Sequence, residues 1–329
     1  MTGKGMGMVT FSLCMIVKNE EKVLRRCLDS VKAVIDEFVI VDTGSTDGTK
    51  AIIKEYTDKE YHFDWVHDFA AARNYAFEQC TMDYVLTMDA DEYIDAENLE
   101  RLKLLKEAML PEIDIVQMLY TNQLSFSTIY NYDTEYRPKL FKRVRGFVWE
   151  HPIHETVRLE PVIYDSEVEI QHLPEESHTE RDLAVFRRMI KSGEPLDDKM
   201  NHLYARELYI SGTDQDVVIA GPYFKRLIDT DAVSGDLFLE ALCVAARASR
   251  LEKDNIALMK YALKAIVTEG CSEICCELGD FFIEVQDYIE AKIWFYNAIY
   301  ETESVLNLKY HDTYPLDRMK YIEPFLQDE

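Results

Sequence analysis

Short apolar runs separated by polar segments fill the first half of the chain. Residues 10–17, 38–41 and 84–88 are β-branched, aromatic or aliphatic without helical spacing, which is typical of buried strands. Between the first two runs, apolar side chains in residues 23–31 recur at helical spacing, with charges on the other face. This alternation of strands and helices predicts an α/β fold with a mostly parallel sheet and right-handed crossovers.

After residue 176 the pattern changes to glycine-poor helical segments. Small and aromatic residues there reproduce the spacing of the tetratricopeptide motif, in which small residues let two antiparallel helices approach. These residues are Leu278, Gly279, Phe282, Ala291, Phe295 and Ala298. Residues 202–228 and 236–268 resemble looser units of the same kind. We therefore expect an α/β domain in residues 1–175 and an all-α, tetratricopeptide-like domain in residues 176–329.

Carboxylates crowd the end of the third apolar run, at Asp89, Asp91 and Glu92. At the carboxyl end of a parallel strand, where open α/β sheets bind ligands, Asp89 and Asp91 should point the same way, being two apart on an extended backbone. Two such oxygen donors suit Mg²⁺ or Mn²⁺, which keeps open positions for substrate phosphates. The pair predicts a metal–diphosphate clamp, although solvated acids also cap many strand ends.

Basic side chains gather between residues 130 and 145. They are Arg137, Lys139, Lys142, Arg143 and Arg145. Two interpretations stand, a solvated hairpin and a set of contacts to the phosphates of a nucleotide donor.

The segment FVWEHPIHETV, residues 147–157, is the second place where polar chemistry concentrates. Its histidines and glutamates follow neither zinc-hydrolase order, and Pro152 opposes a regular helix that would gather them. A neutral His154 is a candidate to complete the metal site at Asp91. Glu150 and Glu155 are candidates for a general base facing the clamp.

Composition narrows the possible partners. The 329 residues, of which 47% are hydrophobic, suffice for two packed domains. A net charge of -25 argues against nucleic acid or an anionic membrane as partner. A nucleotide diphosphate remains compatible if a divalent cation and a few basic groups reverse the potential locally.

Cysteine usage and hydropathy bear on the compartment. The seven cysteines are odd in number and sit mostly in apolar stretches, which favours reduced core residues. No apolar run approaches the ~20 residues that cross a bilayer, and the N-terminus lacks the cleavage site of a signal peptide. We expect a cytoplasmic protein without stable membrane insertion.

The N-terminal half resembles the nucleotide-binding half of family 2 glycosyltransferases with the GT-A fold. The resemblance is carried by four segments in order, SLCMIVKNEEKVLRRCLDSV, FVIVDTGSTDGT, DFAAARN and TMDADE. The following segment RPKLFKRVRGFVWEHPIHETV, then YARELY and the helical tail, resembles the subgroup that contains the sublancin-type peptide S-glycosyltransferases.

The resemblance implies a role for each matching position. The residues expected to bind the nucleotide donor are Val17, Asn19, Glu20, Asp42, Arg73, Asp89, Ala90, Asp91 and Arg137. Among them Arg73 would reach the uracil or the diphosphate, while Asp89 and Asp91 would hold the metal. Many family members carry a second acid after the second strand, whereas Thr43 follows Asp42 here, so the contact to the base is open.

The activity implied is a single in-line displacement that inverts the anomeric centre. A UDP-sugar, glucose or N-acetylglucosamine, would be the donor, Mg²⁺ or Mn²⁺ the cofactor, and a Cys or Ser/Thr side chain of a peptide or protein the acceptor. Two alternatives are a lipid-linked or polysaccharide acceptor and a noncatalytic repeat scaffold. Because repeat tails often mediate dimers, a homodimer is a candidate state.

Overall fold

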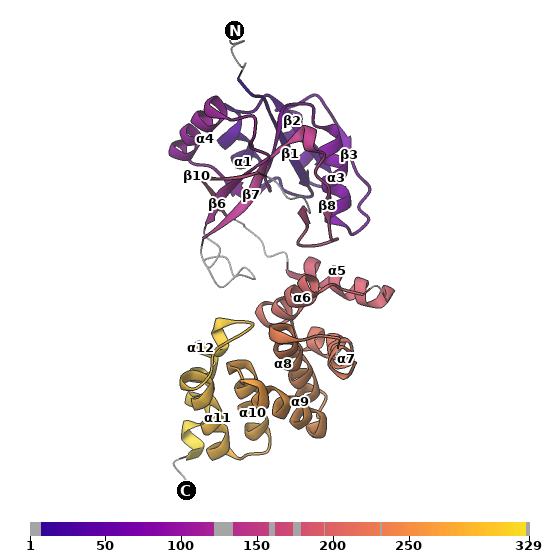
Figure 1. The fold of residues 1–329 in the computed structure, drawn as a ribbon. Coiled ribbons are helices and arrows are strands. Elements are labelled where there is room, and N and C mark those ends of the chain that lie inside the picture. Colours follow the sequence, from indigo (N-terminus) through magenta and orange to yellow (C-terminus); the bar gives the residue numbers. More distant parts are fainter. Residues whose placement is uncertain are drawn as a thin grey trace. The chain divides into compact units, whose positions relative to one another are not determined.

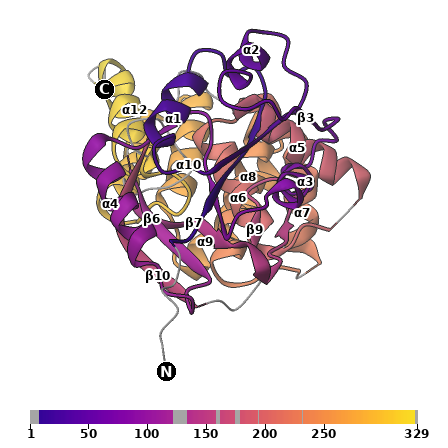
Figure 2. The ribbon, with the colours of Figure 1, turned by 90° about the horizontal axis from the view of Figure 1, so that it is seen from above.

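The computed structural model describes residues 8–121, 134–157, 162–173, 179–193, 195–230 and 232–326. The chain divides into two compact units, Met1–Ser177 and His178–Glu329 (Figures 1 and 2). The expected domain boundary, between residues 175 and 176, lies outside the described residues. Within those residues, no helix has both the length and the apolar character needed to cross a bilayer.

The first unit is built on an eight-stranded sheet with the strand order β3-β2-β1-β4-β7-β6-β10-β5. Its strands are β1 (Phe11–Val17), β2 (Glu37–Asp42), β3 (Tyr61–His62), β4 (Tyr84–Thr87), β5 (Glu92–Tyr93), β6 (Ile115–Thr121), β7 (Glu135–Lys142) and β10 (Ile163–His172). Parallel pairing joins β3 to β2, β2 to β1, β1 to β4 and β6 to β10. A separate hairpin consists of β8 (Trp149–Glu150) and β9 (Thr156–Val157).

Helices cover both faces of this sheet. They are α1 (Leu24–Val31), α2 (Thr49–Ile53), α3 (Phe69–Gln79) and α4 (Ala96–Ala108), and a 3-10 turn, η2 (Arg143–Arg145), follows β7. The larger core packs Leu13 of β1 against Leu28 of α1 and Leu102 of α4. On the other face, Cys14 of β1 packs with Ala76 of α3. Successive residues of β1 thus point to opposite layers, as a strand buried on both faces requires.

The second unit is helical. Its elements are α5 (Thr179–Ser192), α6 (Asp198–Ile210), α7 (Asp214–Asp229), α8 (Gly235–Leu251), α9 (Asn255–Thr268), α10 (Ser272–Glu284), α11 (Tyr288–Tyr300), η3 (Leu308–Tyr310), α12 (Thr313–Ile322) and η4 (Glu323–Leu326). The predicted fold class, a mostly parallel α/β sheet followed by an all-α region, is confirmed.

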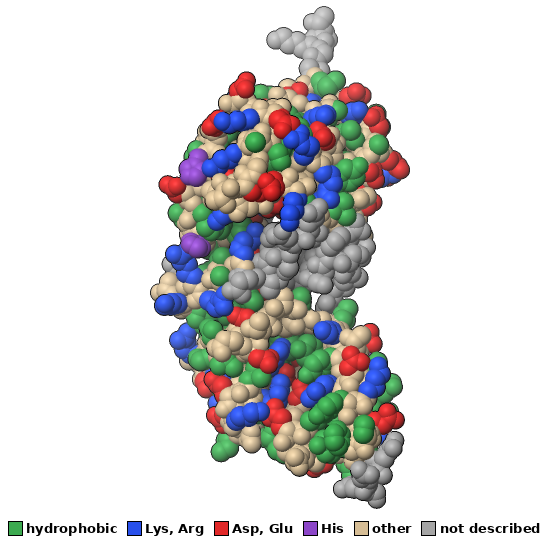
Figure 3. Space-filling model, turned by 180° about the vertical axis from the view of Figure 1, so that it is seen from behind, with side chains coloured by type: hydrophobic (Ala, Val, Ile, Leu, Met, Phe, Trp, Pro, Cys, Tyr) green, Lys and Arg blue, Asp and Glu red, His purple; other side chains and the backbone are tan. Residues whose placement is uncertain are grey.

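Small residues allow close helix packing in the second unit. A Cβ at Gly279 of α10 would lie 2.6 Å from the ring of Phe295 on α11, and one at Gly221 of α7 would lie 2.6 Å from the Cβ of Ala248 on α8. The helices approach at the positions where the tetratricopeptide spacing places glycine and phenylalanine. Acidic and basic side chains are interspersed over each unit on the face drawn in Figure 3.

Candidate active site

The carboxyl ends of three adjacent parallel strands, β2, β1 and β4, lie at one edge of the sheet. Val17 ends β1 directly opposite Asp42, which ends β2. The backbone N–H of Thr43 donates to the carbonyl of Val17 across 2.9 Å, so the two strand ends stay joined beyond the sheet. Polar residues that are distant in sequence therefore meet here, where open α/β sheets bind ligands.

The loops after β1 and β2 hold one another through side chains. Asn19 adopts the left-handed conformation (φ 57°), which Asn tolerates better than most residues. Its backbone N–H donates to the Ser45 hydroxyl (2.9 Å), and its side-chain oxygen accepts from the N–H of Thr46 (2.8 Å). The N–H of Glu20 donates to the Thr49 hydroxyl (2.7 Å). Asn19 and Glu20 are thus placed beside the turn that follows Asp42.

Asp42 is buried and orders that turn. Its carboxylate accepts from the backbone N–H groups of Ser45 (3.0 Å) and Gly44 (3.1 Å). Burial alone would raise the pKa of Asp42, but these hydrogen bonds outweigh it and lower the pKa below its usual value. The carboxylate is therefore charged and already oriented. Its contact to a nucleoside stays a prediction.

The expectation that Asp89 and Asp91 point the same way because they lie two apart on an extended backbone is wrong, since the backbone turns between them. Strand β4 ends at Thr87, and residues 89–92 form a turn in which the N–H of Glu92 donates to the carbonyl of Asp89 (3.1 Å). The Glu92 carboxylate closes this turn by accepting from the N–H of Asp89 (3.1 Å). The two aspartate side chains consequently meet different partners, Arg73 for Asp89 and His172 for Asp91.

Glu92 anchors the turn from below. Its side chain is fully buried, and the ammonium group of Lys139 on β7 lies 2.5 Å from it. Burial raises the pKa of Glu92 above its usual value in spite of this ammonium group. An isolated buried charge would be far more costly, so the pair explains how a carboxylate can lie under the site. Sequence reasoning missed this role of Glu92 and Lys139.

The interpretation of residues 137–145 as one set of phosphate contacts is wrong. Lys139 forms an ion pair with Glu92, and Lys142 donates to the carbonyl of Pro111. Arg143 donates to the carbonyl of Met82 and Arg145 pairs with Asp114. The side chains diverge because Lys142 ends β7, and Arg143 and Arg145 lie in the turn η2 beyond the strand. Part of the basic stretch, residues 130–133, lies outside the described residues.

Arg73 on α3 links two carboxylates that come from different segments. Its guanidinium donates to Asp89 (2.9 Å) and pairs with Glu155 in the loop between β8 and β9. The Arg73 side chain is only 14% exposed. Burial lowers the pKa of Arg73, but the two carboxylates outweigh it and raise the pKa, while the pKa of Asp89 falls well below its usual value. Arg73 and Asp89 are therefore both charged.

The neighbouring Asn74 fixes the hairpin that carries Glu150 and leads to Glu155. Its side chain donates to the carbonyl of Trp149 (2.9 Å) and accepts from the N–H of the same residue (2.8 Å). Glu150 lies opposite Thr156 in this hairpin. Helix α3 thus holds the segment with both candidate bases through two successive residues, Arg73 and Asn74.

His172, which sequence reasoning overlooked, is the histidine that the structure brings to Asp91. Its Nε2 lies 3.4 Å from the Asp91 carboxylate, and both side chains are mostly buried. The position at the carboxyl end of β10 is the signal that was available, because residue 172 ends a long strand beside the acidic turn. His154 lies in the loop between β8 and β9 with φ 49°. Its role in metal binding stays a prediction.

The donor set at Asp91 fits a divalent cation of the Mn²⁺ or Mg²⁺ class. One carboxylate and one imidazole meet there, and an oxygen–nitrogen pair of this kind suits such ions, while the Asp89 carboxylate is paired with Arg73. The histidine shifts the preference from Mg²⁺ toward Mn²⁺, because imidazole is a better ligand for transition metals.

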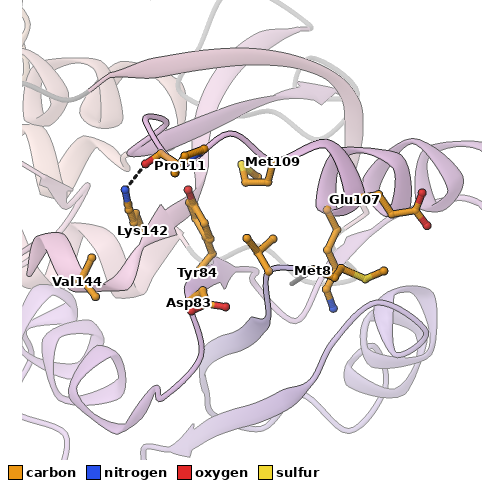
Figure 4. A pocket seen from close by; sticks show the side chains of 10 residues that line it. Met8, Asp83, Tyr84, Glu107, Met109, Pro111, Lys142 and Val144 are labelled. Carbon is orange, nitrogen blue, oxygen red and sulfur yellow. Dashed lines mark hydrogen bonds between the residues drawn. The ribbon is translucent and has the colours of Figure 1, made fainter. Parts of the chain in front are cut away.

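In two other candidate sites, polar groups already form hydrogen bonds within the protein. A cavity of about 300 Å³ lies at the opposite end of β4, beside Tyr84 (Figure 4). The Tyr84 hydroxyl donates to the carbonyl of Ile113 there (2.8 Å). In the second unit, Cys243, Cys271 and Glu273 form a buried group with metal-ligand types. The Glu273 carboxylate, however, accepts from the N–H groups of residues 305, 306 and 307, so it holds a loop.

A mostly parallel sheet with polar groups at the carboxyl ends of its strands is the architecture of open α/β domains that bind ligands at this edge, and this is the class that the fold and site define. Residues 12–158 match the family model "Glycosyl transferase family 2". The first unit therefore contains a family 2 glycosyltransferase domain.

Two relatives illustrate how the similarity is distributed. The SPbeta prophage-derived glycosyltransferase SunS of Bacillus subtilis is 28% identical over 79% of this chain and 63% of its own length. A TPR repeat-containing protein of Synechococcus elongatus is 48% identical over 30% of this chain and 25% of its own length. The matched part of this chain thus spans less than two thirds of the length of the first relative and a quarter of the length of the second. Among solved structures, glucosyl-3-phosphoglycerate synthase from Mycobacterium tuberculosis aligns with 57% of this chain and 81% of that one, at 13% identity and a TM-score of 0.40.

Proposed function

We propose that this protein is an inverting, metal-dependent glycosyltransferase that moves a sugar from a UDP-sugar, glucose or N-acetylglucosamine, to a Cys or Ser/Thr side chain of a peptide or protein. The observation that carries the proposal is the joining of Asp89, Arg73 and Glu155 at the carboxyl edge of a family 2 domain. Ionisable groups gathered at the ligand-binding edge of the sheet support a site for a charged, polar substrate.

The donor would lie along the edge formed by β2, β1 and β4. Val17, Asn19, Glu20 and Asp42 would contact the nucleoside, since their loops already form one hydrogen-bonded surface. Arg73 would contribute positive charge near the diphosphate, and Ala90 is the donor contact that the resemblance implies between the two aspartates. Arg137 of β7 is the remaining donor candidate.

Asp91, Asp89 and His172 would hold the divalent cation, with His154 as a further candidate ligand. When bound, such a cation neutralises the charge that builds on the departing diphosphate. The protein itself would fix the distance between the anomeric carbon and the acceptor, which removes much of the entropic barrier.

Glu155 is the preferred general base, and Glu150 the alternative. The bond between the anomeric carbon and the diphosphate breaks, its electron pair leaves with UDP, and a carbon–sulfur or carbon–oxygen bond forms on the opposite face. The proton of the acceptor passes to the carboxylate. A thiol is more acidic than a hydroxyl, so a Cys acceptor would depend less on Glu155.

The test is UDP release from UDP-glucose and UDP-N-acetylglucosamine in the presence of Mn²⁺. Asp91→Ala should lower turnover by roughly a thousandfold, as expected when ~4 kcal/mol of charge stabilisation is lost. Glu100→Ala, an exposed acid on α4, is the matched control and should behave as wild type. Full activity of Asp91→Ala would overturn the assignment.

The acceptor is identified by incubating the enzyme and donor with protein and lipid fractions. Mass spectrometry should find the added hexose on a peptide side chain. A hexose found on lipid or polysaccharide alone would replace the acceptor class and leave the donor chemistry in place. Failure to bind UDP with or without Mn²⁺ would favour a noncatalytic scaffold.

A further inference from the structure

Tyr120 of β6 lies at the centre of the charged groups beneath the site. The guanidinium carbon of Arg137 is 3.9 Å from the centroid of its ring, and the ammonium nitrogen of Lys139 is 5.1 Å away. The ring of His172 lies 5.5 Å from it, tilted by 33°. Tyr120 itself is buried, with 4% of its surface exposed. One aromatic ring thus contacts three polar side chains from two other strands.

The strand register explains how one residue reaches all of them. Strand β6 lies between β7 and β10 in the sheet. Tyr120 pairs directly with Glu135 on β7 and with Ile170 on β10. Arg137 and His172 are each two residues further along those strands, so they share its face and lie on the diagonals. Aromatic side chains are long enough to make such diagonal contacts.

The contacts made by His172 and Lys139 lead to the acidic turn. His172 lies beside Asp91 (3.4 Å), and Lys139 beside Glu92 (2.5 Å), which closes the turn at Asp89. The Tyr120 ring therefore contacts His172, the partner of Asp91, and Lys139, the partner of Glu92. Its negative face also favours cations, which suits Arg137 and Lys139.

We propose that Tyr120 is a positioning residue for the donor site. Its ring holds the imidazole of His172 against Asp91, and it holds the guanidinium of Arg137 in place on the adjacent strand β7. This inference rests on the proposed function, because it assigns Asp91 and His172 to the cation. The ring performs the task, since Arg137, Lys139 and His172 all contact Tyr120 through its ring. Groups that orient metal ligands typically change metal affinity 10- to 100-fold when removed.

The test compares Tyr120→Leu with Tyr120→Phe, using calorimetry of UDP binding with and without Mn²⁺. Tyr120→Leu should weaken the Mn²⁺-dependent binding of UDP by about tenfold or more. Tyr120→Phe, which keeps the ring, should stay within about threefold of wild type. Tyr164→Leu on β10, a half-exposed tyrosine of the same sheet, is the control and should bind as wild type. Thermal unfolding of each variant establishes that it is folded.

A double variant separates positioning from general packing. If Tyr120 acts through His172, then Tyr120→Leu should cost little further affinity in a His172→Gln background. Additive losses would assign Tyr120 a packing role and overturn the inference, as would wild-type binding by Tyr120→Leu. A weakened Tyr120→Phe would place the effect on the hydroxyl and equally overturn it. If wild-type protein shows no Mn²⁺-dependent binding of UDP, both this inference and the proposed function fail.

Discussion

Both units bury carboxylates, but they complete them differently. In the second unit, Glu273 accepts hydrogen bonds from three backbone N–H groups and from the Ser304 hydroxyl. In the first unit, the Asp91 carboxylate lies 3.4 Å from Nε2 of His172, beyond normal hydrogen-bonding distance. A buried acid surrounded by short donors is committed to structure. An acid with a distant, polarisable partner keeps coordination capacity for a ligand, and this contrast separates a scaffold from a site.

The strongest way to break this comparison is to remove each acid in turn. Glu273→Ala leaves several buried N–H groups without an acceptor, so the free energy of unfolding should fall by about 3 kcal/mol or more. Asp91→Ala, which strands no such group, should change it by less than about 1 kcal/mol while abolishing donor turnover. Urea unfolding followed by circular dichroism measures both. Equal destabilisation by the two substitutions would contradict the division of roles.

A second experiment sharpens the helical side of the comparison. Gly279→Ala places a Cβ 2.6 Å from the ring of Phe295 on the facing helix. Such overpacking typically costs 1–3 kcal/mol, so we expect a loss of about 2 kcal/mol with unchanged UDP binding. Combining it with Phe295→Leu should recover part of the loss. At Gly235, by contrast, no atom lies within 4 Å of an added Cβ, so close packing does not explain every glycine of this unit.

A third experiment concerns the pH dependence of stability. Burial raises the pKa of Glu207 on α6 to about 7, against 4.5 for an exposed glutamate. Between these values the folded protein holds a proton that the unfolded chain has released, so stability falls as the pH rises from about 4.5 to about 7. The full shift corresponds to at most about 3 kcal/mol, with 1.36 kcal/mol per pKa unit.

Glu207→Gln should flatten this dependence, since the amide does not titrate. Unfolding free energies measured at pH 5 and pH 8 should converge in the variant and differ in wild type. Glu97→Gln, on the exposed face of α4, is the control and should leave the dependence as it is. An unchanged pH dependence in Glu207→Gln would contradict the raised pKa.

The sequence predicted those features that local patterns determine. The apolar runs at residues 10–17 and 84–88 correspond to β1 and β4. They could be predicted because a strand that is buried on both faces has a nearly continuous apolar sequence. The glycine and phenylalanine at positions 279 and 295 predicted close helix packing, since only a residue without a Cβ fits there. The assignment of strand-end residues to one edge follows from parallel topology alone.

Features that depend on distant partners could not be predicted in this way. The turn at Asp89 forms around Glu92, whose burial requires Lys139, 47 positions later in the chain. His172 reaches Asp91 through the pairing of β10 with β5, which periodicity does not reveal. The basic side chains from residue 142 onward diverge because β7 ends there and a 3-10 turn follows, and each side chain meets a different distant partner. In each case a long-range contact overrides the local expectation.

The shielding of the Glu92–Lys139 pair has a practical consequence for the medium in which the protein works. Mobile ions attenuate attractions between exposed charges over a screening length of about 10 Å at 0.1 M salt. They hardly reach groups that are enclosed by protein. The exposed pair of Arg25 and Glu55 will loosen as ionic strength rises, whereas the enclosed pair will not. The turn that presents Asp89 and Asp91 should therefore keep its shape from dilute buffer to concentrated salt.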